Sequence, residues 1–137
     1  MLTIVNFSLK LYKMFIISIE TGFSAAHSIK GYKGDCSHIH GHNYRVEVNI
    51  QSDYLNKIGM SLDFRELKRI SKKAVGSLDH KNLNDIEFFR KNNPTAENIA
   101  KFLYQIIKRE LKGKVSLYSV KVWETDEYAV TYKELTD

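Results

Sequence analysis

Apolar and polar residues alternate strictly between Tyr44 and Ile50. Tyr44, Val46, Val48 and Ile50 are apolar, and the residues between them are polar. This period of two predicts a half-buried strand. An earlier run over residues 14–19 is apolar and rich in strand-forming residues, so the two segments predict a strand pair. The long loop expected between them contains most of the histidines, and long loops in compact domains often carry function.

Two later segments have helical periodicity. Residues 64–78 predict an amphipathic helix that begins with a capping-box pair, Asp63 followed by Glu66. Residues 99–111 form a second apolar stripe, for which Thr95 can serve as the cap. The middle of the chain is therefore expected to be helical.

The end of the chain returns to strand-like patterns. Residues 117–124 and 129–132 predict two strands separated by a turn, so the order of elements is ββααββ. This order predicts an α+β fold in which both helices cover one face of an antiparallel four-stranded sheet. Such a sheet has open edges, which favours association between copies of the chain.

Length and composition are those of one compact domain. The chain has 137 residues, is 43% hydrophobic and contains no low-complexity tract. We expect a single domain over residues 14–137, preceded by an extension or a strand over residues 1–13. Charge at Lys10 and Lys13 breaks the first apolar segment, so neither a membrane span nor a signal peptide is predicted. A cytoplasmic protein without a membrane partner is expected.

The formal net charge is +5, which favours anionic partners without naming one. Much of the excess lies in residues 68–73 and 108–112, at spacings expected of solvated helix faces, so solubility alone also explains it. No basic run is interleaved with aromatic residues, and nucleic acid is therefore not an expected partner.

Four of the five histidines lie between positions 27 and 42. In an extended segment His40 and His42 point to the same side, so both imidazoles can bind one metal ion. A third ligand, His27, would leave one coordination position open, as in catalytic zinc sites. His38 has the same parity and is a rival ligand. A group of solvent-exposed loop histidines is the alternative interpretation.

Cys36 is the only cysteine of the chain and stands four residues before His40. A single cysteine cannot form an intramolecular disulfide, so its use must lie in packing, metal binding or thiolate chemistry.

Short motifs are distributed over most of the chain after Met14. They are Phe23-Ser24-Ala25-Ala26-His27, Cys36-x-x-x-His40-Gly41-His42-Asn43-Tyr44, Leu78-Asp79-His80, Asn93-Pro94-Thr95-Ala96-Glu97 and Trp123-Glu124-Thr125. Together they resemble the family of the 6-pyruvoyltetrahydropterin and 6-carboxytetrahydropterin synthases. The resemblance implies the tunnelling fold (T-fold), ββααββ, which agrees with the order of elements predicted above.

The resemblance also implies a ligand set. His27, His40 and His42 would hold a catalytic Zn²⁺, and His38 would not be a ligand. Zinc bound to the hydroxyls of a pterin side chain would polarise them and make the adjacent C–H more acidic.

The resemblance assigns the proton-transfer groups as well. Cys36 would be the general base, because a thiolate near a cation can accept a proton. Asp79 and His80 would belong to the same catalytic relay. Without the resemblance, an ordinary polar helix terminus would be the preferred interpretation of Asp79 and His80.

Substrate recognition would depend on Glu124. Its carboxylate, at the end of a predicted strand, could accept paired hydrogen bonds from the guanidine-like edge of a pterin. Thr95 and Glu97 would assist, although helix capping alone explains Thr95. Trp123 and the neighbouring tyrosines are expected in the core or at an interface rather than as a stacking platform.

The three-residue gap between Cys36 and His40 resembles the bacterial and archaeal 6-carboxytetrahydropterin synthases. The implied reaction converts 7,8-dihydroneopterin triphosphate to 6-carboxy-5,6,7,8-tetrahydropterin, with release of acetaldehyde and triphosphate, on the route to queuosine or archaeosine. Lys30, Lys33 and Arg45 are candidates for binding the triphosphate. The implied assembly is a homohexamer of two trimers with sites at subunit boundaries. The alternatives are 6-pyruvoyltetrahydropterin synthase activity, a non-catalytic zinc- or pterin-binding module and, last, an RNA-binding protein.

Overall fold

Residues 13–135 are described by a computed structural model. Their sheet has the strand order β3-β1-β2-β4-β5. The strands are β1 (Phe15–His27), β2 (His40–Ser52), β3 (Lys81–Asn82), β4 (Ser116–Trp123) and β5 (Ala129–Tyr132). The α-helices are α1 (Phe64–Gly76), α2 (Glu87–Lys91) and α3 (Ala96–Glu110), and single 3₁₀ turns occupy Asp35–Ser37 and Leu83–Asp85.

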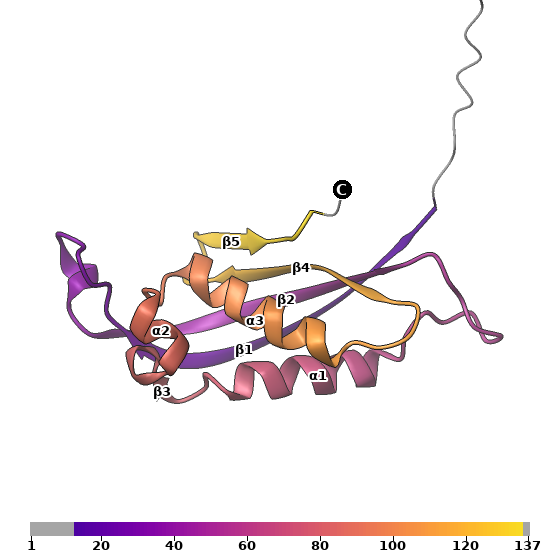
Figure 1. Ribbon diagram of the computed structural model, residues 1–137, viewed down its shortest axis with the longest axis horizontal. Coiled ribbons are helices and arrows are strands. Elements are labelled where there is room, and N and C mark those ends of the chain that lie inside the picture. Colours follow the sequence, from indigo (N-terminus) through magenta and orange to yellow (C-terminus); the bar gives the residue numbers. More distant parts are fainter. Residues whose placement is uncertain (1–12, 136–137) are drawn as a thin grey trace, which may run out of the picture.

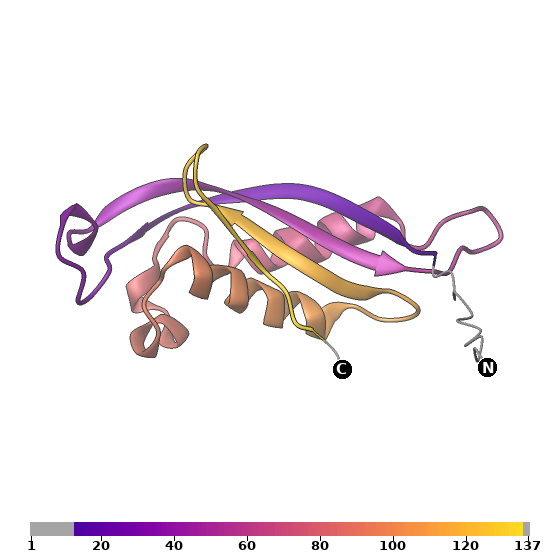
Figure 2. The same cartoon turned by 90° about the horizontal axis from the view of Figure 1, so that it is seen from above.

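Helices α1 and α3 lie on one face of the sheet, α1 against β1 and α3 across β4 and β5 (Figures 1 and 2). The predicted α+β layering and the four antiparallel strands are confirmed. The sheet also has a fifth strand, β3, which runs parallel to β1 and pairs with it only at Ala25 and Ala26. A two-residue strand and the five-residue helix α2 are too short to produce a periodic pattern, so the sequence predicts neither.

Alternation along β2 explains why the sheet packs against the helices. Tyr44, Val46, Val48 and Ile50 are all buried and face the helices. The helices contribute their own apolar stripes, with Leu67, Leu103 and Ile107 fully buried among them. Removal of these side chains from water is the main favourable term that holds the layers together.

The first two strands are longer than the patterns at residues 14–19 and 44–50 indicate. β1 continues to His27 and β2 begins at His40, and these two residues are direct register partners. Residues 22–26 are mostly small or polar and have weak strand preference, but pairing with β2 decides their conformation. Three of the four histidines predicted for a long loop, His27, His40 and His42, therefore lie at strand ends, whereas His38 lies in the loop 28–39, which projects beyond the sheet (Figure 1).

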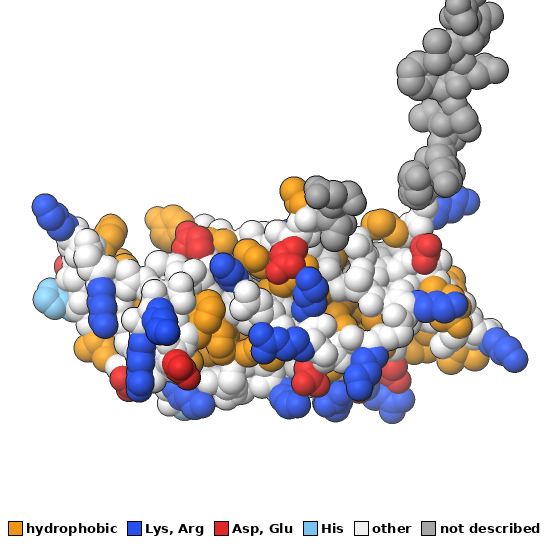
Figure 3. All heavy atoms as spheres, in the orientation of Figure 1, with side chains coloured by type: hydrophobic (Ala, Val, Ile, Leu, Met, Phe, Trp, Pro, Cys, Tyr) orange, Lys and Arg blue, Asp and Glu red, His pale blue; other side chains and the backbone are white. Residues whose placement is uncertain are grey.

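Lys and Arg side chains are dispersed over the face seen in Figure 3 and alternate with acidic and apolar ones. Among the described residues, several Lys and Arg side chains are paired with acidic ones, including Arg69 with Glu66 and Lys108 with Glu134. The positive charge is thus distributed along this face rather than gathered at one point.

Within residues 13–135 no helix is both long and apolar enough to cross a membrane. The extension expected over residues 1–13 falls, except for Lys13, outside the described residues. The division of the chain at Met14 and the cytoplasmic location remain predictions.

Gly22 lies in β1 close to the backbone of β2. A Cβ at this position would lie 2.6 Å from the backbone oxygen of Tyr44. Gly22→Ala should therefore lower the free energy of unfolding by about 1–3 kcal/mol, because the strands must separate locally. Chemical denaturation measures this change.

Gly76→Ala is the matched control. Position 76 is the last residue of α1, and a Cβ there would point into open space, with no heavy atom within 4 Å beyond its own helical turn. Alanine at this position should be neutral or stabilise by up to about 1 kcal/mol. An equal decrease in the free energy of unfolding of both variants would contradict the conclusion that the β2 backbone excludes a side chain at position 22.

Candidate metal and substrate site

Three imidazoles meet where β1 ends and β2 begins. His27, His40 and His42 offer ligand atoms that all lie within 4.8 Å of one another. The Nε2 atoms of His27 and His40 are 3.0 Å apart. The side chains share this place because the strand register pairs His27 with His40, and because residues 40 and 42 lie on the same face of β2.

Backbone carbonyls fix the orientation of two of these rings. His27 Nδ1 donates to the Pro94 oxygen at 2.7 Å, and His40 Nδ1 donates to the His38 oxygen at 2.7 Å. In a neutral imidazole the other nitrogen, Nε2, then carries a lone pair. Two lone pairs that face each other at 3.0 Å repel, and a cation bound by both removes this repulsion. The spacing is close to the roughly 3.3 Å between ligand atoms in a tetrahedral zinc site.

The third imidazole has an unsatisfied atom. His42 Nε2 is buried and has no hydrogen-bond partner among the described residues. Its nearest acidic atom is Glu124 Oε1, at 3.5 Å. Buried polar atoms normally have a partner, so this nitrogen needs one. Three imidazole donors fit Zn²⁺ or a similar divalent ion and leave a coordination position open.

Burial also favours the neutral, metal-binding form of His27 and His42. Desolvation lowers the pKa of His27, although the Pro94 carbonyl and Glu124 oppose the shift. Desolvation likewise lowers the pKa of His42, again opposed by Glu124. Metal ions bind neutral imidazole, so a lowered pKa keeps these side chains ready to bind at neutral pH and somewhat below.

His38 stands outside this cluster. Its side chain is exposed, and its contribution to the centre is the backbone oxygen that accepts from His40. The three clustered histidines are the residues that could hold a metal ion.

A cavity of about 310 Å³ opens beside His27. Four of the other predicted site residues line it, namely Cys36, Thr95, Glu97 and Glu124. Cys36 is half-buried in the 3₁₀ turn, and its carbonyl accepts from the Ile29 N–H at 2.8 Å. The strand end, the helix start and the loop 28–39 thus bring these residues together from distant parts of the chain.

Thr95 also has the structural role proposed from sequence. It is the N-cap of α3, and its hydroxyl accepts from the Asn98 N–H at 3.2 Å. Its place in the cavity follows from the same cap, since α3 begins there.

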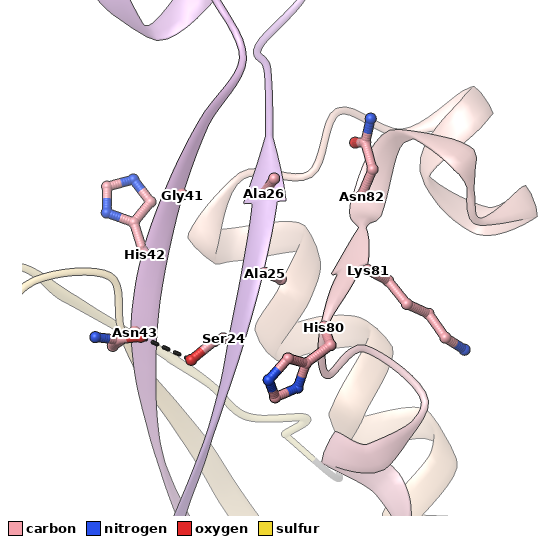
Figure 4. A pocket seen from close by; sticks show the side chains of 9 residues that line it. All are labelled: Ser24, Ala25, Ala26, Gly41, His42, Asn43, His80, Lys81 and Asn82. Carbon is pink, nitrogen blue, oxygen red and sulfur yellow. Dashed lines mark hydrogen bonds between the residues drawn. The ribbon is translucent and has the colours of Figure 1, made fainter.

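Neither Asp79 nor His80 lines the cavity that contains Cys36. His80 borders a second cavity of about 500 Å³, together with Ser24, His42 and Asn43 (Figure 4). Asp79 Oδ2 lies 3.0 Å from His80 Nδ1. The cavity that holds Cys36 does not include His80, so a single chain does not bring the whole predicted relay together in one cavity.

Strand β1 holds the Asp79–His80 pair in place. The Ser24 N–H donates to Asp79 Oδ1 at 2.9 Å, and the His80 N–H donates to the Ser24 oxygen at 2.7 Å. The Ser24 hydrogen bond, followed by His80, lowers the pKa of Asp79. His80 has a φ of 57°, a left-handed conformation that is uncommon outside glycine and is enriched at functional sites.

The family model for 6-pyruvoyl tetrahydropterin synthase matches residues 16–135. The chain belongs to this family. The family resemblance noted in the sequence, and with it an enzyme of the tetrahydropterin synthase type, is therefore confirmed.

Two relatives and one solved structure illustrate the similarity. The dihydroneopterin monophosphate aldolase of Pyrococcus furiosus is 36% identical over 83% of this chain and 93% of its own length. The 6-carboxy-5,6,7,8-tetrahydropterin synthase of Haemophilus influenzae is 32% identical over 88% of this chain and 100% of its own. The structure of Caenorhabditis elegans 6-pyruvoyl tetrahydropterin synthase has a TM-score of 0.81 and 29% identity, and covers 90% of this chain and 97% of that one.

The sequence did not predict several groups that lie around this candidate site. The Pro94 carbonyl that orients His27 is a backbone group, so no side-chain pattern reports it. Tyr32 and Tyr128 line the cavity with Glu124. Of the two places expected for the tyrosines near Trp123, the core is wrong for Tyr128, and an interface stays a prediction. Tyr128 is 68% exposed. Its position five residues after Trp123, in the predicted turn, was the feature of the sequence that indicated an exposed side chain.

The metal cluster predicts a clear difference between neighbouring histidines. His42→Ala should lose metal binding, because two imidazoles remain from three, whereas His38→Ala should retain it. Zinc content of the purified variants and titration with Co²⁺ measure the difference. Retention of full metal affinity by His42→Ala would contradict the three-histidine centre.

Proposed function

We propose that this chain is a zinc-dependent lyase that converts 7,8-dihydroneopterin triphosphate and water to 6-carboxy-5,6,7,8-tetrahydropterin and releases acetaldehyde and triphosphate. The observation that carries the proposal is the single cavity shared by His27, Cys36 and Glu124. A ligand for the metal, a thiol and a carboxylate around one cavity suit proton transfer at a bound, metal-activated substrate. The Haemophilus influenzae relative carries the name of this activity.

His27, His40 and His42 would hold the zinc ion through their Nε2 atoms. When bound, the ion would polarise the hydroxyls of the substrate side chain and make the adjacent C–H more acidic. The carbonyls of Pro94 and His38 keep the rings in the orientation that this requires.

Cys36 would act as the general base. Its side chain lines the cavity beside His27, so its sulfur would take the proton from a side-chain carbon of the bound pterin. The 3₁₀ turn of Asp35–Ser37 and the Ile29 hydrogen bond hold the cysteine at the cavity wall.

Glu124 would bind the pterin ring. Its carboxylate follows directly after β4, and two parallel hydrogen bonds from the 2-amino group and N3–H would fix the plane of the ring. Glu97, in the first turn of α3, and Thr95 would contribute further polar contacts at the same cavity.

Asp79 and His80 would transfer protons to and from the substrate. The carboxylate of Asp79 orients His80 through Nδ1 and leaves Nε2 free for exchange. Lys30, Lys33 and Arg45 are the proposed contacts of the triphosphate. Of these, the Arg45 guanidinium already packs over the Trp123 ring, 4.0 Å from its centre. Lys30 and Lys33, in the loop 28–39, are therefore the preferred candidates.

A homohexamer of two trimers, with sites at subunit boundaries, forms part of the proposal. Two observations support association: Cys36 and His80 line different cavities, and the outer edge of β1 pairs with β3 only at Ala25 and Ala26. Native mass spectrometry should give six times the 15.9 kDa chain mass, and a monomer would contradict this assembly.

A second candidate is aldol cleavage of a dihydroneopterin phosphate. The observation that favours it is the 36% identity to the Pyrococcus furiosus relative, which is named an aldolase for the monophosphate. 6-Pyruvoyltetrahydropterin synthase activity is the third, since it would use the same metal, base and ring contacts.

The deciding experiment incubates zinc-loaded protein with 7,8-dihydroneopterin triphosphate and identifies the products by mass spectrometry. We expect 6-carboxytetrahydropterin and acetaldehyde. A 6-pyruvoyl product, or cleavage of the monophosphate in a parallel reaction, would replace the proposed activity with the corresponding alternative. Unchanged substrates with zinc bound would favour a non-catalytic binding module.

Cys36→Ala should retain zinc and lose activity by about 10²–10⁴-fold, the usual contribution of a general base. His38→Ala, two residues away on the same loop, should keep both zinc and activity. Turnover and zinc content are measured on the same preparations. Full activity in Cys36→Ala would remove the cysteine from the mechanism.

A further inference from the structure

The tyrosines of the described residues fall into two groups. Most have a ring partner: Tyr44 stacks on Phe23, Tyr104 packs against Tyr132, and lysines lie over Tyr54 and Tyr118. Tyr32 and Tyr128 have no aromatic or cationic partner among residues 13–135. Their side chains are also the most exposed of the described tyrosines, at 56% and 68%.

These two tyrosines share one location. Both line the cavity that contains Glu124, although they come from the loop 28–39 and from the β4–β5 turn. Exposed aromatic side chains that converge on a cavity lined by the carboxylates of Glu97 and Glu124 are typical of sites for flat, apolar-faced ligands with a polar edge. Their rings therefore have free faces where a ligand would lie.

Hydrogen bonds within the β4–β5 turn hold Tyr128 and Glu124 in a fixed relation. The Glu124 N–H donates to the Tyr128 oxygen at 3.1 Å and closes the turn. The Thr125 hydroxyl accepts from the N–H groups of Glu127 and Tyr128, both at 3.2 Å. The carboxylate and the ring thus project from one braced turn.

The loop that carries Tyr32 is also braced. Asn93 accepts from the Lys30 N–H at 3.0 Å and donates to the Lys30 oxygen at 2.8 Å, which ties the loop to the segment before α3. Gly34, with a φ of 147°, allows close contact with the Tyr32 ring, because a Cβ there would lie 3.0 Å from the ring atom Cε1. The backbone of this loop is therefore tied to the segment before α3, and the Tyr32 ring lies against Gly34.

We propose that Tyr32 and Tyr128 are substrate-contact residues that pack against the faces of a planar heterocycle whose edge Glu124 binds. This inference rests on the proposed pterin substrate and adds the residues that select for a flat ring. Stacking of a heterocyclic base on an aromatic side chain typically changes affinity by about tenfold or more. The phenol hydroxyls have no part in this contact, so phenylalanine should replace either tyrosine.

The test is titration of zinc-loaded protein with neopterin, a fluorescent and unphosphorylated pterin, by fluorescence quenching. Tyr128→Ala and Tyr32→Ala should each weaken binding about tenfold, whereas Tyr128→Phe and Tyr32→Phe should bind like the unmodified chain. Tyr54→Ala is the matched control, because Tyr54 is 39% exposed, lies under Lys114 and does not line the cavity. Zinc content and the unfolding temperature of each variant show that the metal centre and the fold are intact.

The outcomes separate the inference from the function on which it rests. If the unmodified chain binds neopterin and Tyr128→Ala binds it equally well, the ring-contact proposal is wrong and the pterin function stands. If the unmodified chain does not bind neopterin while zinc is present, the proposed function itself fails. Loss of affinity in Tyr128→Phe as large as in Tyr128→Ala would point to the hydroxyl and overturn the stacking contact.

Discussion

The antiparallel pairing of β1 with β2 is the constraint on which the site depends. The pairing continues to His27 and His40, and a strand alternates its side chains between two faces. A slip of one residue would move Tyr44, Val46 and Val48 out of the core and carry His40 and His42 to the other face with them. The burial energy of the apolar residues therefore also selects the register that assembles the imidazoles. Gly22 permits this register, since any larger residue would meet the β2 backbone.

The same core determines the chemistry of the ligands. The apolar layer ends at the stacked pair Phe23 and Tyr44, and the histidines lie beside this pair. Desolvation by these neighbours disfavours the protonated form of His27 and His42, which lowers the pKa of each. The carbonyls of Pro94 and His38 bind Nδ1 of His27 and of His40, so the Nε2 atoms of these two rings point into the histidine cluster. Folding alone thus favours the neutral form of His27 and His42 and orients the Nε2 atoms of His27 and His40 toward each other, an arrangement that a divalent cation stabilises.

Periodicity was sufficient for the layered fold because β2, α1 and α3 each bury a regular stripe of side chains. It failed for residues 20–27, where pairing rather than propensity makes the strand, and for β3 and α2, which are too short for a period to be recognised. Parity predicted that His40 and His42 share a face but left His38 as a rival ligand, and the family resemblance singled out His27, His40 and His42, which the structure brings together. The support from Pro94 could not, because a carbonyl reached from a distant loop depends on tertiary packing. Asp79 and His80 were identified by their motif, but the motif does not show that His80 borders a different cavity from the one that Cys36 lines.

Strand β1 connects the Asp79–His80 pair to the metal cluster of the same chain. Ser24 binds Asp79 and His80 through both of its backbone groups, and three residues later His27 enters the metal cluster. The relay pair is therefore held at a fixed place relative to the metal ligands of its own chain, but beside the cavity that His42 borders rather than the one that Cys36 lines. A second copy that presents its His80 to the Cys36 cavity would complete the proposed site. In that arrangement the open sheet edges would serve the chemistry as well as stability, because association would bring the base and the relay to the same substrate.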